Sequence, residues 1–203
     1  MATTSAVRIG PTDHGRRLTL EEYLDAEEVE GYAYELARGV LEVTQVPDDP
    51  HGLIEWFLFG RLRDYERDHP GVFFRVGGGS STRIVLPGLV SGRNPDIAIV
   101  PGNALRDERG RRQPAMVIEV VSEGREAHDR DYMAKKQEYL AFGLLEYWIV
   151  DRFERKVTVL IRRGDVWSER VFSGDQAAEG LFLPGFSIHM VDLWAAAESD
   201  LEI

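Results

Sequence analysis

The chain has 203 residues, no cysteine and a formal net charge of -11 at pH 7. The lack of cysteine excludes a disulfide framework, a thiolate zinc site and a cysteine nucleophile. The negative charge argues against a protein that coats nucleic acid without selectivity, because phosphate binding needs exposed lysine and arginine. A hydrophobic share of 43% and a charged share of 29% are typical of a folded globular protein.

Length and hydropathy predict the organisation of the chain. We expect one domain over residues 19–197, with an N-terminal arm over 1–18 and a C-terminal tail over 198–203, because this length suffices for one buried core. No apolar stretch approaches membrane-spanning length, and residues 1–10 lack the features of a secretory signal. A cytoplasmic protein without membrane contact is therefore expected.

The first half of the chain predicts two helices and two pairs of strands. These are a helix over 19–30, a hairpin that turns near Gly39, an amphipathic helix over 51–69, and strands over 72–76 and 82–86. The first helix is indicated by Thr19 and Glu22, which have the spacing of a reciprocal helix cap. The glycine run between the last two strands predicts a flexible turn, and it lacks the ending of a phosphate-binding loop.

The second half predicts a strand, helix, strand order with additions. Its elements are buried strands over 97–100 and 115–121, a helix over 128–142, a strand over 146–151, a hairpin over 157–172 and a short helix over 191–197. Gly143 marks the end of the first of these helices.

Two acidic residues interrupt the buried strands. Asp96 begins the first, in NPDIAIV, and Glu119 lies within the second, in MVIEVVS. A carboxylate there loses favourable hydration unless a cation or hydrogen bonds compensate. A shared divalent cation would do so, and Mg²⁺ fits because it prefers oxygen ligands, with Mn²⁺ as a substitute. The structural alternatives are a buried arginine partner for Glu119 and a turn-capping role for Asp96 after Pro95.

The helix after the second buried strand carries two lysines. Lys135 and Lys136 both lie near its apolar arc, and helical periodicity does not choose between them. A lysine turned toward Asp96 and Glu119 would orient the attacking water and stabilise charge on a phosphate. The alternative for Lys135 is a solvated pair with Asp131, four residues earlier.

Arginines could form a basic rim around such a site, although solvated faces are the simpler interpretation. They fall into two groups, Arg61, Arg63 and Arg67, and Arg106, Arg109, Arg111 and Arg112.

Taken together, four stretches resemble one known family. They are NPDIAIV, MVIEVVS, RDYMAKKQEYLAFGLLEYWIVD and FLPGFSIHMVDLW. They resemble the Uma-type family of putative restriction endonucleases, within the PD-(D/E)XK nuclease superfamily, over roughly residues 19–194. The resemblance implies an α/β fold with a restriction-endonuclease-like core, in which helices flank a mixed central sheet and β-hairpins are added.

The resemblance also implies roles for particular residues. Asp96 and Glu119 correspond to the metal-binding acids. The superfamily expects lysine two residues after the glutamate, where this chain has Val121; the family places it on the next helix, four residues before a tyrosine, which implies Lys135. Lys136 stays an alternative. The YELARGVLE stretch resembles the family's first acidic motif, so Glu35 is a further candidate catalytic residue.

Two positions on the long helix remain secondary candidates. Glu55 is the alternative to Glu35 as the additional acid, and His51 is more simply explained as a polar residue at a helix start.

The function that the resemblance implies is Mg²⁺-dependent endonucleolytic hydrolysis of DNA. The alternative is a catalytically inactive nuclease-fold protein that binds nucleic acid or protein. The net charge and the missing lysine slightly favour this alternative, whereas the presence of Asp96, Glu119 and Lys135 favours the enzyme. A homodimer is also expected, built through the C-terminal hairpin with Trp167 and Phe172 exposed.

Overall fold

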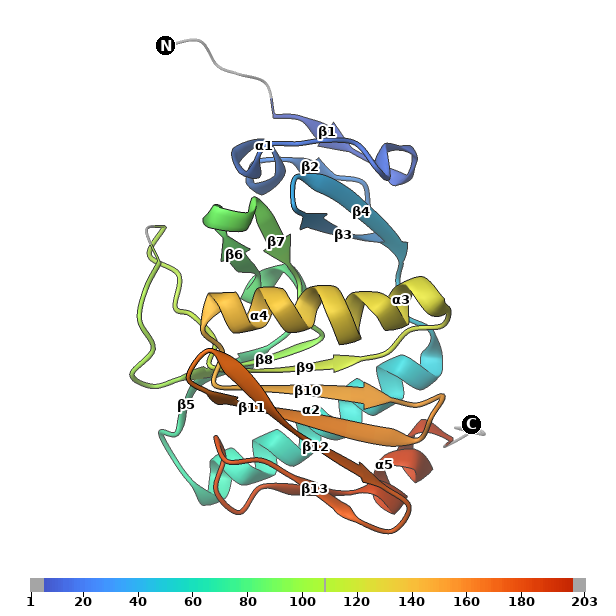
Figure 1. Ribbon diagram of the computed structural model, residues 1–203, viewed down its shortest axis with the longest axis vertical. Coiled ribbons are helices and arrows are strands. Elements are labelled where there is room, and N and C mark those ends of the chain that lie inside the picture. The colour runs from blue at the N-terminus through green and yellow to red at the C-terminus, as the bar shows by residue number, and fades with distance from the viewer. Residues whose placement is uncertain (1–5, 108, 199–203) are drawn as a thin grey trace. The chain divides into compact units, whose positions relative to one another are not determined.

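The computed structural model describes residues 6–107 and 109–198. Residue contacts divide the chain into two compact units, each with its own sheet (Figure 1). The first unit comprises residues 1–46 and 83–94, and the second comprises residues 47–82 and 95–203. None of the described helices combines the length and the apolar character that a membrane crossing requires.

The second unit is built on a six-stranded mixed sheet. Its strands, in chain order, are β5 (Phe73–Gly77), β8 (Ile97–Pro101), β9 (Met116–Val120), β10 (Glu146–Asp151), β11 (Lys156–Arg163) and β12 (Val166–Ser173). The spatial order is β12-β11-β10-β9-β8-β5. Strands β9 and β10 are parallel, and the other neighbours are antiparallel. The apolar runs of β8, β9 and β10 are buried, as expected for central strands covered on both faces.

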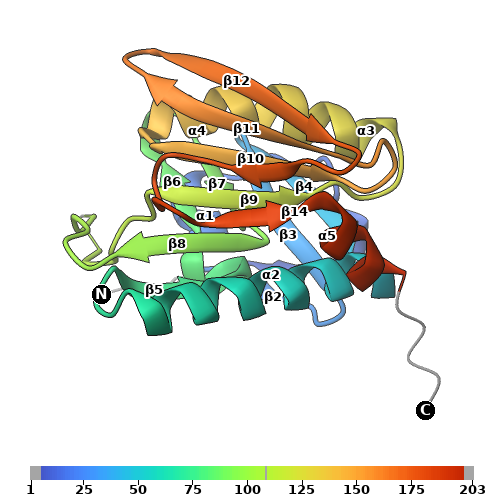
Figure 2. The ribbon, with the colours of Figure 1, turned by 90° about the horizontal axis from the view of Figure 1, so that it is seen from below.

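Helices cover both faces of this sheet (Figure 2). On one face lie α2 (Asp49–Asp68) and α5 (Met190–Ala197), whose Leu58 and Leu193 share an apolar cluster with Ile118 of β9. The other face is covered by the helical segment between β9 and β10, where the rings of Tyr139 and Tyr147 meet edge to face at 5.0 Å. The remaining elements of the unit are η2 (Gly79–Thr82), β13 (Ala177–Glu179) and β14 (Ser187–His189).

The helical segment between β9 and β10 is irregular. It consists of α3 (Arg125–Asp129), the π-helical turn η4 (Arg130–Lys135) and α4 (Lys136–Phe142). Gly143 ends it with a φ of 99°, a conformation that costs glycine little. A π-helical turn bonds residues five apart instead of four, so it shifts the register of everything that follows in the helix. The sequence predicts the helix but not this turn.

The first unit has a four-stranded sheet in the order β4-β3-β7-β6. Its elements are β1 (Arg8–Ile9), η1 (Pro11–Asp13), α1 (Leu20–Leu24), β2 (Glu27–Glu28), β3 (Tyr32–Ala37), β4 (Val40–Gln45), β6 (Ile84–Leu86), η3 (Pro87–Leu89) and β7 (Ser91–Arg93). Tyr23, Leu36 and Leu41 are fully buried in its core. The predicted cap is confirmed, because Thr19 and Glu22 exchange hydrogen bonds at the start of α1.

The predicted fold class is confirmed: helices flank a mixed central sheet, and the hairpins β3–β4 and β11–β12 are present. Two local predictions need correction. Helix α1 ends at Leu24 instead of continuing to residue 30, because β2 begins at Glu27. The strands that flank the glycine run belong to different sheets, β5 in the second unit and β6 in the first. The domain boundaries stay a prediction, and residues 1–5 and 199–203 of the predicted arm and tail lie outside the described residues.

Candidate active site

Glu119 lies in the middle of β9 with only 1% of its surface exposed. Each of its carboxylate oxygens has a partner on the helical segment above it. Lys135 donates to Oε2 over 2.9 Å, and the hydroxyl of Tyr139 donates to Oε1. The buried carboxylate is therefore stabilised by a lysine ammonium and a hydroxyl, where the structural alternative expected an arginine.

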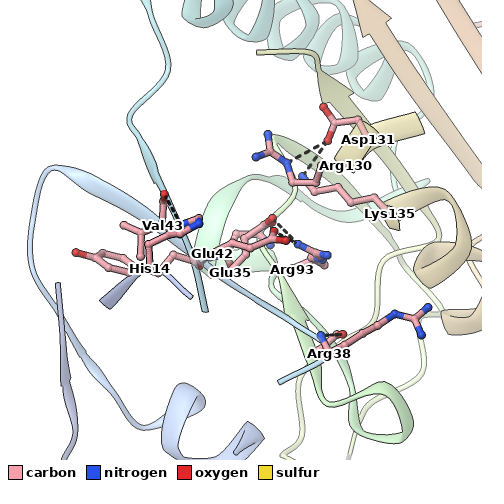
Figure 3. Close-up of polar contacts among 12 residues, drawn as sticks. His14, Glu35, Arg38, Glu42, Val43, Arg93, Arg130, Asp131 and Lys135 are labelled. Carbon is pink, nitrogen blue, oxygen red and sulfur yellow. Dashed lines mark hydrogen bonds and ion pairs between the residues drawn. The ribbon is translucent and has the colours of Figure 1, made fainter. Parts of the chain in front are cut away.

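Lys135 is held from a second side. Its Nζ lies 3.4 Å from Oδ1 of Asp131, and both side chains are almost fully buried. The pair with Asp131 that the spacing predicts is present, but it is buried and not solvated. Figure 3 shows Lys135 and Arg130 reaching the same carboxylate of Asp131. The π-helical turn spans these three residues, and such turns are frequent at functional sites.

Asp96 directly precedes β8 and is half-buried, with 20% of its side chain exposed. Strands β8 and β9 pair Ile97 with Ile118, so one further step in the same register sets Asp96 opposite Glu119. The carboxylate of Asp96 accepts a hydrogen bond of 2.7 Å from the backbone N–H of Val120. Asp96 therefore lies at the start of the strand that neighbours Glu119, and the metal site that the two acids would share stays a prediction.

The carboxylate of Asp96 is contacted from α2. The Nε2 atom of His51 lies 3.3 Å from Oδ2 of Asp96 and 3.1 Å from Oε1 of Glu55. One nitrogen and two carboxylate oxygens from these residues lie within 4.8 Å of one another, a spacing that a single metal ion could bridge. Asp96 is thus contacted from α2, and Glu119 is contacted from the helical segment between β9 and β10.

The pKa values of this group reflect mutual stabilisation. Burial lowers the pKa of His51, but hydrogen bonds and charge from Asp96 and Glu55 outweigh this and raise it to about 10. Burial raises the pKa of Asp96, but the hydrogen bond and charge of His51, with a contribution from the charge of Lys135, give a net lowering. The influence of Lys135 on Asp96 links the Glu119 and His51 groups electrostatically.

A second group of ligand atoms, from His128, Asp151 and Glu154, also lies within 4.8 Å. Here the contacts are structural. Asp151 accepts backbone hydrogen bonds from Phe153 and Glu154, and Glu154 pairs with the ammonium of Lys156. A lysine already supplies positive charge at this place, so the His51, Glu55 and Asp96 group is the better candidate for a metal.

Glu35 lies on β3 in the first unit. Its Oε2 is 3.1 Å from the fully buried Arg93 guanidinium, which also contacts Glu42 at 2.5 Å (Figure 3). Its Oε1 accepts a hydrogen bond of 2.7 Å from the backbone N–H of Asn94. These contacts stabilise the first unit, and a catalytic role for Glu35 stays a prediction.

Other sequence candidates have contacts away from this group. Lys136 pairs with Glu169 at the surface, so Lys135 is the lysine at Glu119. The exposed aromatic residues expected for a homodimer are packed within the second unit instead: Phe172 is 7% exposed, and the indole of Trp167 donates to the carbonyl of Lys136. This corrects their predicted exposure, and the homodimer itself stays a prediction.

His51 and Asp131 are the residues that sequence reasoning undervalued. A signal for His51 existed in its four-residue spacing from Glu55, which puts both side chains on one face of α2. Asp131 had the same signal in its four-residue spacing from Lys135, but the sequence predicted a solvated pair and not a buried one.

The comparisons with known proteins agree with this architecture. Residues 20–192 match the model of the Uma2 family, described as putative restriction endonuclease. The fold is similar to the crystal structure of a protein from Anabaena variabilis described as a putative nuclease belonging to DUF820, with a TM-score of 0.69 and 19% identity over 89% of this chain and 99% of that one. No curated protein matches the chain significantly. Because the family model covers most of its length, the chain belongs to the Uma2 family of putative restriction endonucleases.

Proposed function

We propose that this protein is an endonuclease that hydrolyses DNA phosphodiester bonds with the aid of a divalent cation. The observation that carries the proposal is the buried Lys135–Glu119 pair on the strand next to Asp96, whose carboxylate belongs to a metal-compatible group. Membership of the Uma2 family supports the same activity.

The donor set fits a divalent cation. Asp96 and Glu55 offer carboxylate oxygens and His51 offers an imidazole nitrogen, all within a span that one ion could bridge. Carboxylates suit Mg²⁺ and Mn²⁺, whereas an imidazole nitrogen suits transition-metal ions better than Mg²⁺. We therefore expect Mn²⁺ to support activity at least as well as Mg²⁺. Glu119 is the second candidate ligand beside Asp96, and its two oxygens already accept hydrogen bonds from Lys135 and Tyr139.

A bound cation would stabilise negative charge on the phosphate and make a water molecule more acidic. The side chains of this protein would stabilise the developing charge and hold the reacting groups in position. The ammonium of Lys135 can donate to a phosphate oxygen, where charge grows as water attacks phosphorus and the bond to the leaving oxygen breaks. Asp131 and Tyr139 would fix Lys135 and Glu119 in position for this step.

The test is cleavage of supercoiled plasmid and of single-stranded DNA with Mg²⁺, Mn²⁺ or EDTA. We expect cleavage with either metal and none in EDTA. Asp96→Ala, Glu119→Ala and Lys135→Ala should each lower the rate by about 10²-fold or more, as is typical when a charged group at the reacting centre is removed.

Matched controls make this test specific. Lys136→Ala removes the neighbouring lysine, which pairs with Glu169 at the surface, and Asp165→Ala removes a fully exposed acid; both should retain the wild-type rate. Equal cleavage by wild type, Asp96→Ala and Glu119→Ala would point to a contaminating nuclease. Folded wild-type protein that binds DNA but cleaves none of these substrates with either metal would favour the non-catalytic binding module.

A further inference from the structure

A hollow of about 350 Å³ is lined by residues of α2 and β5 in the second unit. Its lining is formed by Trp56, Phe59, Gly60, Arg63, Glu66 and Val76. The volume is in the range of small-ligand sites, and aromatic walls with a few charged groups are typical of them. Nothing in the proposed chemistry at Asp96 and Glu119 uses these side chains.

Trp56 is unusual because 78% of its surface is exposed. It shares one helix face with Phe59, Gly60 and Arg63, at intervals of three, four and seven residues. A Cβ added at Gly60 would meet no atom within 4 Å, so the missing side chain leaves open space between the indole and the arginine. An exposed indole beside an open space provides a flat surface on which another ring can stack.

The charged groups in the hollow favour an anionic ligand on one side. Arg63 is exposed and has no ion-pair partner among the residues that the structure describes, whereas Arg67 on the same helix is paired with Asp64 and Asp68. Glu66 gives the far end of the hollow the opposite charge. A nucleotide unit of a single strand carries both a flat base and a phosphate. The base could stack on the indole of Trp56 while the phosphate contacts Arg63.

Both walls of the hollow continue to the candidate active site. On α2, Trp56 directly follows Glu55 of the metal-compatible group. On β5, Val76 is followed by Gly77 and Gly78, and the backbone of Gly78 lies so close to Asp96 that a Cβ there would be 2.1 Å from the carbonyl oxygen of Asp96. A strand with one base in the hollow could therefore reach the Asp96 group with a neighbouring phosphate.

We propose that this hollow binds an unstacked base of a single-stranded DNA segment, with Trp56 stacking on the base and Arg63 contacting the backbone. This inference rests on the proposed nuclease function and names the form of its substrate. Stacking is tolerant of sequence because every base has a flat face, so the hollow selects unpaired DNA and not a particular sequence. Paired bases in a duplex are covered by their neighbours and would need to be flipped out first.

The test measures binding of fluorescein-labelled oligo(dT) and of a duplex of equal length by anisotropy, in EDTA so that no divalent ion supports cleavage. Trp56→Ala should weaken single-strand binding at least about fivefold, the lower bound for one stacked base, and should change duplex binding less. Gly60→Leu should weaken it similarly by filling the hollow. Arg63→Ala should weaken binding and reduce its salt dependence, as loss of one phosphate contact does.

Controls come from the same molecule. Leu105→Ala removes a side chain that is also 78% exposed, and Arg61→Ala removes an exposed arginine of α2 that does not line the hollow; both should bind like wild type. The proposal is overturned if wild type binds no single strand, if Trp56→Ala equals Leu105→Ala, or if single strand and duplex respond alike. Cleavage that depends on Asp96 but not on Trp56 would overturn this inference and leave the proposed function intact. Single-strand binding that depends on Trp56, without any cleavage, would support this inference and overturn the proposed function.

Discussion

Lys135 places its Nζ 2.9 Å from Oε2 of Glu119, and neither side chain is more than 5% exposed. A buried pair of this kind contributes little net stability compared with apolar residues, but removing one partner leaves an uncompensated charge. The relationship therefore predicts both the chemistry of the site and the response of the fold to substitution.

Lys135→Met should lower the free energy of unfolding by about 3–5 kcal/mol, because Glu119 would keep its burial without its cation. Lys136→Met should cost at most about 1 kcal/mol, since its pair with Glu169 is solvent-exposed. Urea unfolding followed by tryptophan fluorescence measures both values. Equal stability of the two variants would show that the Lys135 contact does not exist in solution.

Tyr139→Phe should lower stability by about 1–3 kcal/mol, because a buried carboxylate oxygen loses its hydroxyl donor. If Tyr139 positions Glu119, the rate constant of cleavage should fall while the apparent affinity for DNA stays unchanged. Single-turnover cleavage at saturating DNA separates these two quantities. Tyr147→Phe is a suitable comparison, because that hydroxyl donates to the backbone carbonyl of Asp131 and not to Glu119.

Glu35→Gln tests the candidate of the first unit. Its contacts with Arg93 and Asn94 predict a loss of about 1–3 kcal/mol in unfolding free energy, since a charge-assisted hydrogen bond is weakened in a half-buried place. A catalytic role predicts in addition that the folded variant loses cleavage. Well-folded Glu35→Gln protein with the wild-type rate would remove Glu35 from the catalytic set and leave it a structural residue.

Without metal, the stability of the protein should fall as pH rises from about 6.5 toward 10. The pKa of His51 is raised from 6.5 to about 10 in the folded state, so its contribution is complete below 6.5 and is lost as pH rises through 10. His51→Gln should flatten this slope. Urea unfolding in EDTA across this range provides the measurement, and an unchanged slope in His51→Gln would contradict the contact with Asp96.

Gly78→Ala should disturb Asp96 directly. The added Cβ would collide with a backbone atom that has no freedom to rotate away, and overpacking of this kind costs about 1–3 kcal/mol. We also expect a lower cleavage rate, because Asp96 must shift. Gly60→Ala should instead stabilise α2 by up to about 1 kcal/mol, since its surroundings are open. Thermal unfolding and plasmid cleavage measure the stability and the activity of both variants. Unchanged stability and cleavage in Gly78→Ala would refute the close approach of Gly78 to Asp96.

The main elements of the sheet could be predicted from the sequence because apolar runs and their breaks determine them locally. Asp96 and Glu119 stood out for the same reason, as charged residues within such runs. Contacts over long sequence distance could not be predicted this way. Glu146 is also a buried strand acid, yet it is satisfied by the backbone N–H groups of Leu181 and Phe182 and by the indole of Trp148. Its partners distinguish it from Glu119, and the two backbone donors come from a segment 35 and 36 residues away.

The contact of His51 with Asp96 is another long-range contact that could not be predicted from the sequence. A histidine at a helix start is usually a surface residue. The spacing of His51 from Glu55 does not reveal which residue of the sheet packs against the two side chains. That depends on the packing of α2 against the end of β8, which brings Asp96 to within 3.3 Å. The glycine run had no recognisable binding pattern. The structure gives a reason for glycine at position 78, because its backbone lies too close to Asp96 for a side chain.

The π-helical turn at Arg130–Lys135 has a consequence for how this chain can change. Such a turn is equivalent to one residue inserted into a regular helix, and deleting a residue from it would restore ordinary α-helical bonding. The more regular helix would, however, rotate everything after the deletion by about a quarter turn or more, which would carry Tyr139 away from Glu119. Shortening this helix by a single residue should thus make its hydrogen bonding more regular but separate Tyr139 from Glu119, so the length of the helix should be kept in engineered variants.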